Sequence, residues 1–319
     1  LVILTIFLCV AFYELLGICV AYKKQPEVSN TTKKETKNGS WNECSENTER
    51  AVIIEKNPEA LLQRVRLIKN AKKEIILSTF AFQSDESGKL ILGALHDAAD
   101  RGVHIRLLVD GMESWIDMEG NPYFYGLSSH ENVEIKLYNK ANPLKPWKMM
   151  GRMHDKYLIA DGKRYILGGR NTYNYFLGDF PGHKNYDRDV LVVCDEPEKE
   201  NSVNQLLEYF ETIWEQEDSG YFHDNKKLAN RQSVKNAVLE LQNGYQKYFE
   251  ENKERICDTD YTDETFETEK IALVSNPIHT GSKEPVVWYQ LGELMKNAKN
   301  RVKIHTPYII CNDMMYNTW

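Results

Sequence analysis

Six residues between positions 151 and 171 have types and spacing that suit catalysis on an anionic substrate. They are His154, Lys156, Asp161, Gly168, Gly169 and Asn171. An imidazole can act as a nucleophile, and a neighbouring ammonium or amide can stabilise negative charge on substrate oxygens. The apolar residues on both sides of Asp161-Gly162 predict a β-hairpin with that pair at its turn. Because side chains two apart on a strand point the same way, His154 and Lys156 are expected side by side.

These residues form a pattern that belongs to a known family. His154-x-Lys156-x4-Asp161, followed by Gly168-Gly169-x-Asn171, resembles the signature of the phospholipase D superfamily. The segment SGKLILGALHDAADRGVHIRLLVD before it, and GGRNTYNYF and DRDVLVV after it, are similar to bacterial cardiolipin synthases of that superfamily. A lone histidine on a strand is more often structural, but this many partners at fixed spacing favour a catalytic origin.

The resemblance implies a mechanism for phosphodiesters. His154 would attack phosphorus and form a covalent phosphohistidine, which splits one difficult displacement into two steps. Lys156 and Asn171 would stabilise the phosphate oxygens without a metal. A second histidine, from a second lobe, would protonate the leaving alkoxide and later activate the incoming alcohol or water.

The remaining motif positions are expected to support this chemistry. Asp161 is expected to brace the hairpin rather than touch substrate, and Gly168 and Gly169 to let the backbone approach the phosphate closely. Asp189 is the preferred carboxylate for orienting the nucleophilic imidazole through its far ring nitrogen, and Asp187 is the alternative.

Composition limits the possible partners and cofactors. The chain has 319 residues, 42% hydrophobic and 27% charged, with a net charge of -7. It therefore lacks the strongly basic balance of proteins that grip nucleic acid, so no nucleic-acid partner is expected. The six cysteines are scattered, with none of the Cys/His spacings that hold zinc. We expect no metal and no cofactor.

The N-terminal segment is apolar. Residues 1–22 contain one charged side chain, Glu14, and are long enough to cross a hydrocarbon core. A single transmembrane anchor is the preferred interpretation, and a cleaved signal sequence is the alternative. The side of the membrane on which the protein lies is left open. Residues 23–50 are polar and are expected to form a flexible tether.

Helical and strand patterns alternate along the rest of the chain. They predict an α/β fold in which a mixed, mostly parallel sheet is flanked by helices, as in a phospholipase D-like lobe. We assign residues 51–243 to this first lobe, 244–270 to an acidic linker and 271–319 to the beginning of a second, homologous lobe.

An internal similarity supports the second lobe. The segment LIKNAKKEIILSTFAF, which starts at Leu67, aligns without gaps with LMKNAKNRVKIHTPYI, which starts at Leu294. A counterpart of His154 would then fall at position 381, beyond Trp319. We therefore expect a fragment that holds one of two motifs and is inactive alone, with the missing lobe supplying the other half of the site.

Three functions fit these patterns. The preferred one is a membrane-attached phosphodiesterase or phosphatidyltransferase, most like cardiolipin synthase, acting on a phosphatidylglycerol-like phospholipid. The alternatives are a nuclease of the same superfamily and a non-catalytic protein that binds phosphate at a half-site. The sequence leaves open whether water or a lipid alcohol is the acceptor.

Overall fold

The computed structural model describes residues 2–39, 49–194, 196, 201–306 and 313–316. The chain divides into two compact units. The sheet unit comprises Cys44–Leu144 and Gly151–Ile271, and the anchor unit comprises Leu1–Glu43, Lys145–Met150 and Ala272–Trp319.

The sheet unit is built on one nine-stranded sheet with the strand order β8-β4-β3-β2-β5-β6-β7-β1-β9. The strands are β1 Glu49–Ile54, β2 Glu74–Thr79, β3 His104–Asp110, β4 Val133–Tyr138, β5 Tyr157–Ala160, β6 Arg164–Gly168, β7 Asp189–Cys194, β8 Ser219–Tyr221 and β9 Phe266–Glu267. The helices of this unit are α3 Asn57–Asn70, α4 Glu86–Asp100, α5 Gly111–Asp117, α6 Pro122–Ser128, α7 Ser202–Trp214, α8 Gln232–Glu251 and α9 Lys253–Cys257, with a 3-10 turn, η3, at Lys226–Asn230.

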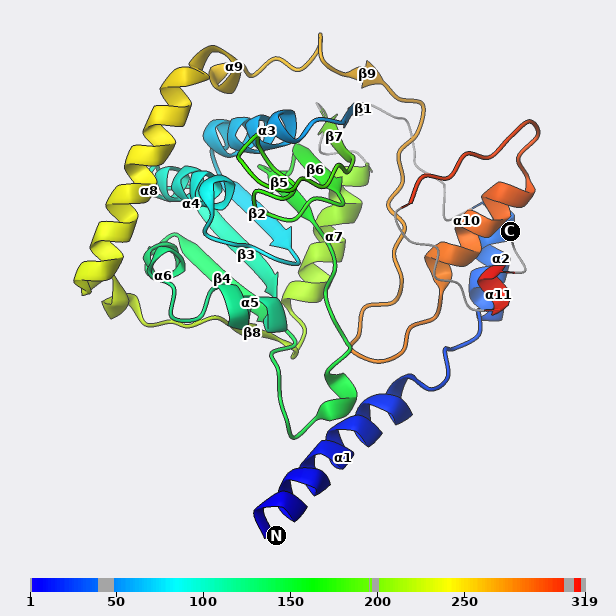
Figure 1. Cartoon of the computed structure of the whole chain (residues 1–319). Helices are drawn as coiled ribbons and strands as arrows, with labels where there is room; N and C mark the ends of the chain where they lie inside the picture. The colour runs from blue at the N-terminus through cyan, green and yellow to red at the C-terminus, as the bar shows by residue number, and fades with distance from the viewer. Residues whose placement is uncertain (1, 40–48, 195, 197–200, 307–312, 317–319) are drawn as a thin grey trace. The chain divides into compact units, whose positions relative to one another are not determined.

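Helices cover both faces of this sheet (Figure 1). Alternate residues of β3, such as Leu107, join the buried core under α3, α4 and α6. The intervening residue Arg106 points to the other face, where its guanidinium lies 4.7 Å from the ring centre of Phe210 on α7. This alternation is the period-two pattern of a strand buried on both sides.

The sheet is mixed, as expected, but the prediction that it is mostly parallel is wrong. Among the described strands, parallel pairing is confined to β2 with β3 and β3 with β4. The other neighbours pair antiparallel. Parallel pairing requires a crossover helix, which α4 supplies between β2 and β3, whereas β5 and β6 form a hairpin.

The chain segments that carry the motif residues lie at one edge of the sheet. The strands β2, β3 and β4 end there, at Thr79, Asp110 and Tyr138. The antiparallel strand β5 begins there, because Tyr157 pairs with Ser78 near the end of β2. We call it the carboxyl edge. Residues that directly precede β5 or follow β2 and β3 must therefore lie near one another.

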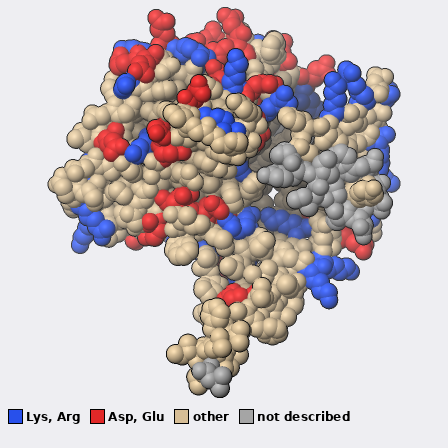
Figure 2. Space-filling view, in the orientation of Figure 1, with Lys and Arg blue, Asp and Glu red and all other residues tan. Residues whose placement is uncertain are grey.

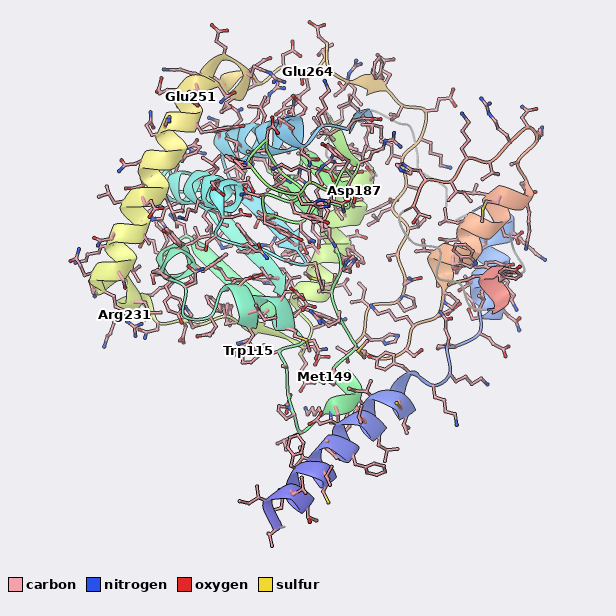
Figure 3. All side chains as sticks on the ribbon, viewed as in Figure 1. Trp115, Met149, Asp187, Arg231, Glu251 and Glu264 are labelled. Carbon is pink, nitrogen blue, oxygen red and sulfur yellow. The ribbon has the colours of Figure 1, made fainter. Side chains whose placement is uncertain are left out.

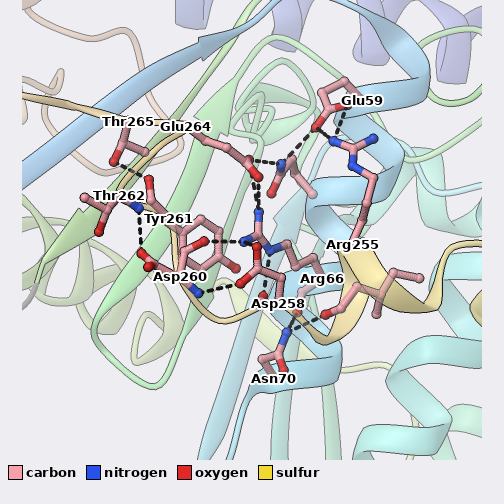
Figure 4. A network of polar contacts seen from close by, with 12 residues as sticks. Glu59, Arg66, Asn70, Arg255, Asp258, Asp260, Tyr261, Thr262, Glu264 and Thr265 are labelled. Carbon is pink, nitrogen blue, oxygen red and sulfur yellow. Dashed lines mark hydrogen bonds and ion pairs between the residues drawn. The ribbon is translucent and has the colours of Figure 1, made fainter.

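The segment expected as an acidic linker, 244–270, is largely folded. Helix α8 continues to Glu251, α9 follows, and β9 pairs with β1. Figure 4 shows how the stretch after α9 is fastened to α3: the fully buried Arg66 pairs with Asp258 and Glu264. Its guanidinium also lies 3.9 Å from the ring centre of Tyr261. The acidic composition of this segment predicted a linker. Its acidic residues Asp258 and Glu264 instead pair with Arg66, which lies about 190 residues earlier in the chain.

The anchor unit contains the apolar N-terminal helix α1, Val2–Tyr22, and the helices α2, Asn30–Asn38, and α10, Val286–Lys296. It also contains α11, Asp313–Tyr316, and a 3-10 turn, η2, at Pro146–Lys148. Helix α2 lies inside the predicted flexible tether, where the hydroxyl of Thr32 donates to Glu284, 2.7 Å away. The rest of the tether, from 40 to 48, lies outside the described residues.

Of the elements predicted for a second lobe, only the first helix is formed among the described residues. Helix α10 matches α3 in the internal repeat, but residues 301–306 do not form the strand that matches β2. A strand needs neighbouring strands to pair its backbone groups, and none is described beside this segment. The remainder of the predicted strand, 307–309, lies outside the described residues, so a second lobe stays a prediction.

Candidate active site

The predicted hairpin is confirmed. Strands β5 and β6 pair antiparallel from Tyr157 with Leu167 to Ala160 with Arg164. Asp161 and Gly162 both have left-handed backbone angles, with φ of 55° and 63°. Such angles match the twist of a tight hairpin turn and are tolerated best by Asn, Asp and Gly.

His154 and Lys156 directly precede β5 at the carboxyl edge rather than lying within the strand. The backbone pairing still reaches Lys156, whose carbonyl accepts from Gly168 N–H at 3.1 Å. The His154 side chain is exposed, whereas Lys156 is only 5% exposed. The Lys156 Nζ donates to the carbonyl oxygen of His154 at 2.6 Å. The ammonium is thus held within the backbone turn that carries the imidazole.

A single aromatic ring, Phe80, lies at the centre of this cluster. The His154 ring meets it edge-on, with 4.7 Å between ring centres. The Lys156 Nζ lies 5.3 Å and the Arg152 guanidinium 5.1 Å from the centre of the same ring. The side chains of His154 and Lys156 therefore both lie against the Phe80 ring. Cation–aromatic attraction helps to hold the two cations there.

Reduced contact with water shifts the pKa of both central groups, although the His154 side chain is exposed at its outer side. The loss of surrounding water lowers the pKa of His154, and the Lys156 ammonium lowers it further. The imidazole is therefore neutral at pH 7, as a nucleophile must be. Burial also lowers the pKa of Lys156 to about 8, against the opposing carboxylates of Asp155 and Asp187. Lys156 thus keeps its charge at pH 7 in a poorly solvated position, where a substrate anion would be its strongest partner.

Asp110 fixes the chain just before His154. This carboxylate is 1% exposed and ends β3. It accepts from Met153 N–H at 3.0 Å and from the Arg152 guanidinium at 2.6 Å. Sequence reasoning missed Asp110, although an acidic residue directly after the buried run RLLV was a usable signal. Its charge also acts on both His154 and Lys156.

A second carboxylate, Asp155, belongs to the residue between His154 and Lys156 in the sequence. The hydroxyl of Tyr209 on α7 donates to its Oδ2 at 2.7 Å. Burial, followed by the Asp155 charge, raises the pKa of Tyr209. The phenol therefore stays protonated as a donor and ties the motif turn to α7.

Asn171 lies on the segment that returns to the carboxyl edge after β6. It is 7% exposed, and its Oδ1 accepts from Ala81 N–H at 3.3 Å. Its amide group also hydrogen-bonds Tyr173, whose pKa burial raises. The neighbouring Thr172 N–H donates to the Ala81 carbonyl at 3.1 Å. Asn171 is thereby attached one residue beyond Phe80, close to His154 and Lys156.

The Asp161 carboxylate lies at the other end of the hairpin. It accepts from three consecutive backbone N–H groups, those of Lys72, Lys73 and Glu74, at 2.7–3.1 Å. These residues lead into β2. The structure thus gives Asp161 contacts that join the hairpin turn to the start of β2.

The expected contact between Asp189 and His154 is not what the structure shows. The Asp189 side chain is fully buried and pairs with Arg64 at 2.9 Å and Arg170 at 3.2 Å. The carboxylates that oppose the lowering of the pKa of His154 are those of Asp155 and Asp110. Sequence reasoning did not anticipate this pairing. Arg64 on α3 and Arg170 are both buried, and a buried cation loses more free energy without a carboxylate partner than an exposed imidazole does.

The two glycines after β6 make room for carboxylates. A Cβ at Gly168 would meet Asp189 Oδ1 at 2.0 Å, and one at Gly169 would meet Asp187 Oδ2 at 2.0 Å. Figure 3 labels Asp187 near the start of β7. Close approach was expected here, but the approaching groups are protein side chains. The role of the glycines toward a phosphate stays a prediction.

The described residues contain no cluster of three or more His, Cys, Asp or Glu side chains that could hold a metal ion. The arrangement offers instead an exposed neutral imidazole, a buried ammonium and a buried amide at one edge of the sheet. Together these groups could bind an oxyanion and attack its central atom.

Comparison with known proteins agrees with this chemistry. Residues 64–214 match the family described as "Cardiolipin synthase, PLD-like domain". An uncharacterized protein of Helicobacter pylori strain J99 is 28% identical over 292 residues, 82% of this chain and 54% of that protein. Cardiolipin synthase C of Escherichia coli K12 is 29% identical over 171 residues, 49% of this chain and 34% of that enzyme.

A solved structure is also similar. Phosphatidylserine synthase of Haemophilus influenzae Rd KW20 has a TM-score of 0.45 and 16% identity, over 77% of this chain and 52% of that one. The chain spans about half the length of the H. pylori relative and a smaller share of the E. coli enzyme. The match at residues 64–214 contains every motif residue from His154 to Asp189, so this part of the chain is a phospholipase D-like domain similar to that of cardiolipin synthases.

Proposed function

We propose that this chain is part of a membrane-attached phosphodiesterase or phosphatidyltransferase that acts on phosphatidylglycerol-like lipids. The observation that carries the proposal is the convergence of the His154 imidazole and the buried Lys156 ammonium on the Phe80 ring, with Asn171 anchored beside it. The match of residues 64–214 to a phospholipase D-like domain supports the reaction class, and the apolar helix α1 supports a lipid substrate.

The first step transfers the phosphatidyl group to the enzyme. A ring nitrogen of neutral His154 attacks phosphorus, a nitrogen–phosphorus bond forms, and the bond from phosphorus to the headgroup oxygen breaks. Lys156 and Asn171 stabilise the charge that shifts onto the non-bridging oxygens. The leaving alkoxide takes a proton from a general acid, which we assign to the histidine of a second motif that this chain does not contain.

The second step releases the group. That second histidine, now neutral, removes the proton of an incoming alcohol or water, whose oxygen forms a new bond to phosphorus. The bond from phosphorus to His154 breaks and the free imidazole returns. An acceptor alcohol on another phosphatidylglycerol gives cardiolipin, and water gives phosphatidic acid.

The test measures both lipid and nucleic-acid turnover in the full-length protein. Phosphatidylglycerol vesicles and single-stranded DNA are the two substrates, and products are identified by mass spectrometry. We expect lipid products that disappear in His154→Ala and persist in His183→Ala, an exposed histidine outside the motif. DNA cleavage that depends on His154, without lipid turnover, would instead identify a nuclease. Loss of both activities with retained phosphate binding would identify a non-catalytic half-site.

A further inference from the structure

Large apolar side chains are exposed where the chain leaves the carboxyl edge. On α5, which follows β3 directly, Trp115 and Ile116 are 69% and 67% exposed. After β4, Leu144 is 78% exposed. Figure 3 shows Trp115 on α5, near the ends of β3 and β4. Such exposure costs free energy in water, and neighbouring apolar residues of this size commonly mark an interaction surface.

The two groups of residues come from adjacent segments. A Cβ at Gly111, the first residue of α5, would lie only 2.7 Å from the backbone of Lys140. The start of α5 therefore packs directly on the segment that leads from β4 to Leu144. Both segments leave the edge of the sheet at which His154 lies.

The chain that continues from Leu144 leads to the apolar helix. The turn η2 at Pro146–Lys148 packs on α1, since a Cβ at Gly17 would lie 2.5 Å from Cγ of Pro146. In Figure 2, the surface of α1, at the bottom of the view, is almost wholly uncharged. Among the described helices, α1 is the one long and apolar enough to cross a membrane. No residue of its most apolar stretch is buried. From η2 the chain returns to Gly151, three residues before His154.

The loop between these points has the composition of a membrane-surface segment. Trp147 and Met150 are 46% and 57% exposed, and they alternate with Lys145 and Lys148. Tryptophan favours the boundary between headgroups and acyl chains, and lysine is attracted to anionic headgroups. Apolar side chains beside cationic ones suit a lipid surface better than a protein–protein interface, where lysine is depleted.

We propose that Trp115, Ile116 and Leu144, all in the sheet unit, form a bilayer-docking surface, which inserts into an anionic membrane beside the catalytic histidine. This inference rests on the proposed function and deepens it, because it says how a lipid phosphate reaches His154. The segment that follows Leu144 directly in the chain, with Trp147 between Lys145 and Lys148, has the composition that favours an anionic bilayer as the partner.

Photo-crosslinking to lipid tests the surface without requiring turnover. The photoreactive residue benzoylphenylalanine replaces Trp115 or Leu144 in the full chain, reconstituted in vesicles with or without phosphatidylglycerol in phosphatidylcholine. Matched controls carry it at Leu239, a residue of α8 that is 57% exposed, and at Leu8 of α1. Lipid adducts are counted by mass spectrometry. Unchanged far-ultraviolet circular dichroism shows that each variant is folded.

We expect adducts at positions 115 and 144 to exceed those at 239 by at least about fivefold, and to increase with phosphatidylglycerol. Adducts at 115 and 144 no more frequent than at 239 would overturn the inference, whether or not position 8 is labelled. The proposed function fails separately, if His154→Ala leaves lipid turnover unchanged. A protein that turns over lipid through His154 but gives no such adducts would overturn the docking surface alone. A protein that gives the adducts but shows no turnover dependent on His154 would overturn the proposed function alone.

Discussion

At the scale of single residues, Lys156 makes the clearest prediction, because its pKa of about 8 lies within an accessible range. An oxyanion binds the ammonium form, so its affinity should be constant below this pKa and fall as the pH rises through it. His154, whose pKa is lowered, stays neutral throughout. Tungstate, a fully ionised phosphate analogue, can be titrated calorimetrically from pH 7 to pH 9.5.

The expected decline approaches about tenfold per pH unit well above the pKa, until the pKa of the complex is reached. Lys156→Met should bind weakly at every pH, and the exposed control Lys163→Gln should behave like the wild type. An affinity that does not change with pH in the wild type would show that Lys156 does not bind the anion.

Gly169 makes a prediction about stability. The three atoms nearest to a Cβ there all belong to the Asp187 side chain, so Gly169→Ala should destabilise the fold by about 1–3 kcal/mol. Removing the obstructing carboxylate with Asp187→Ala should restore part of that loss, which a double-mutant cycle in urea measures. Gly168→Ala should not be rescued by Asp189→Ala, since the carbonyl of Arg188 also lies within 2.6 Å.

The control for both glycines is Gly220→Ala, where a Cβ would meet nothing within 4 Å. If Asp187→Ala fails to compensate for Gly169→Ala, the glycine is required for another reason, such as approach of the backbone to substrate.

At the scale of elements, Asp161 joins the hairpin to the beginning of β2. Asp161→Ala removes the acceptor of three backbone N–H groups and should cost about 1–2 kcal/mol in free energy of unfolding. Asp161→Asn should cost less, since asparagine keeps one acceptor and tolerates the left-handed φ. Tungstate affinity should be unchanged in both variants. A large loss of affinity with normal stability would instead place Asp161 in the binding site.

The helices and strands also differ in how well the sequence predicted them. The hairpin, α4 and α7 were predictable because their signals are local: a turn pair, a glycine stop and a helical period. The antiparallel majority of the sheet was not, because β1, β8 and β9 join it through pairings with strands distant in sequence. The partner of Asp189 escaped prediction for the same reason, since Arg64 precedes it by 125 residues.

At the scale of the whole molecule, the segment after α9 ties the end of the sheet unit to α3. Arg66 is 1% exposed and is the centre of that attachment. Arg66→Leu should cost roughly 1–3 kcal/mol, because it removes a buried cation whose partners Asp258 and Glu264 are themselves 47% and 38% exposed. The matched control is Arg255→Leu, whose partner Glu59 lies on the surface, and it should cost about 1 kcal/mol or less.

Urea unfolding gives both values, and limited proteolysis should cut the Arg66 variant first between residues 258 and 265. Equal destabilisation by the two substitutions would show that the segment is not held by its buried cation.

The central claim is that His154 carries the phosphatidyl group during the reaction. The most direct measurement is mass spectrometry of the full-length protein, mixed briefly with phosphatidylglycerol and quenched in alkali, because a nitrogen–phosphorus bond hydrolyses in acid. The account predicts a phosphatidyl adduct on the peptide that contains His154, formed and lost at the rate of turnover and missing in His154→Ala. Turnover without an adduct there, or an adduct on another residue, would contradict it.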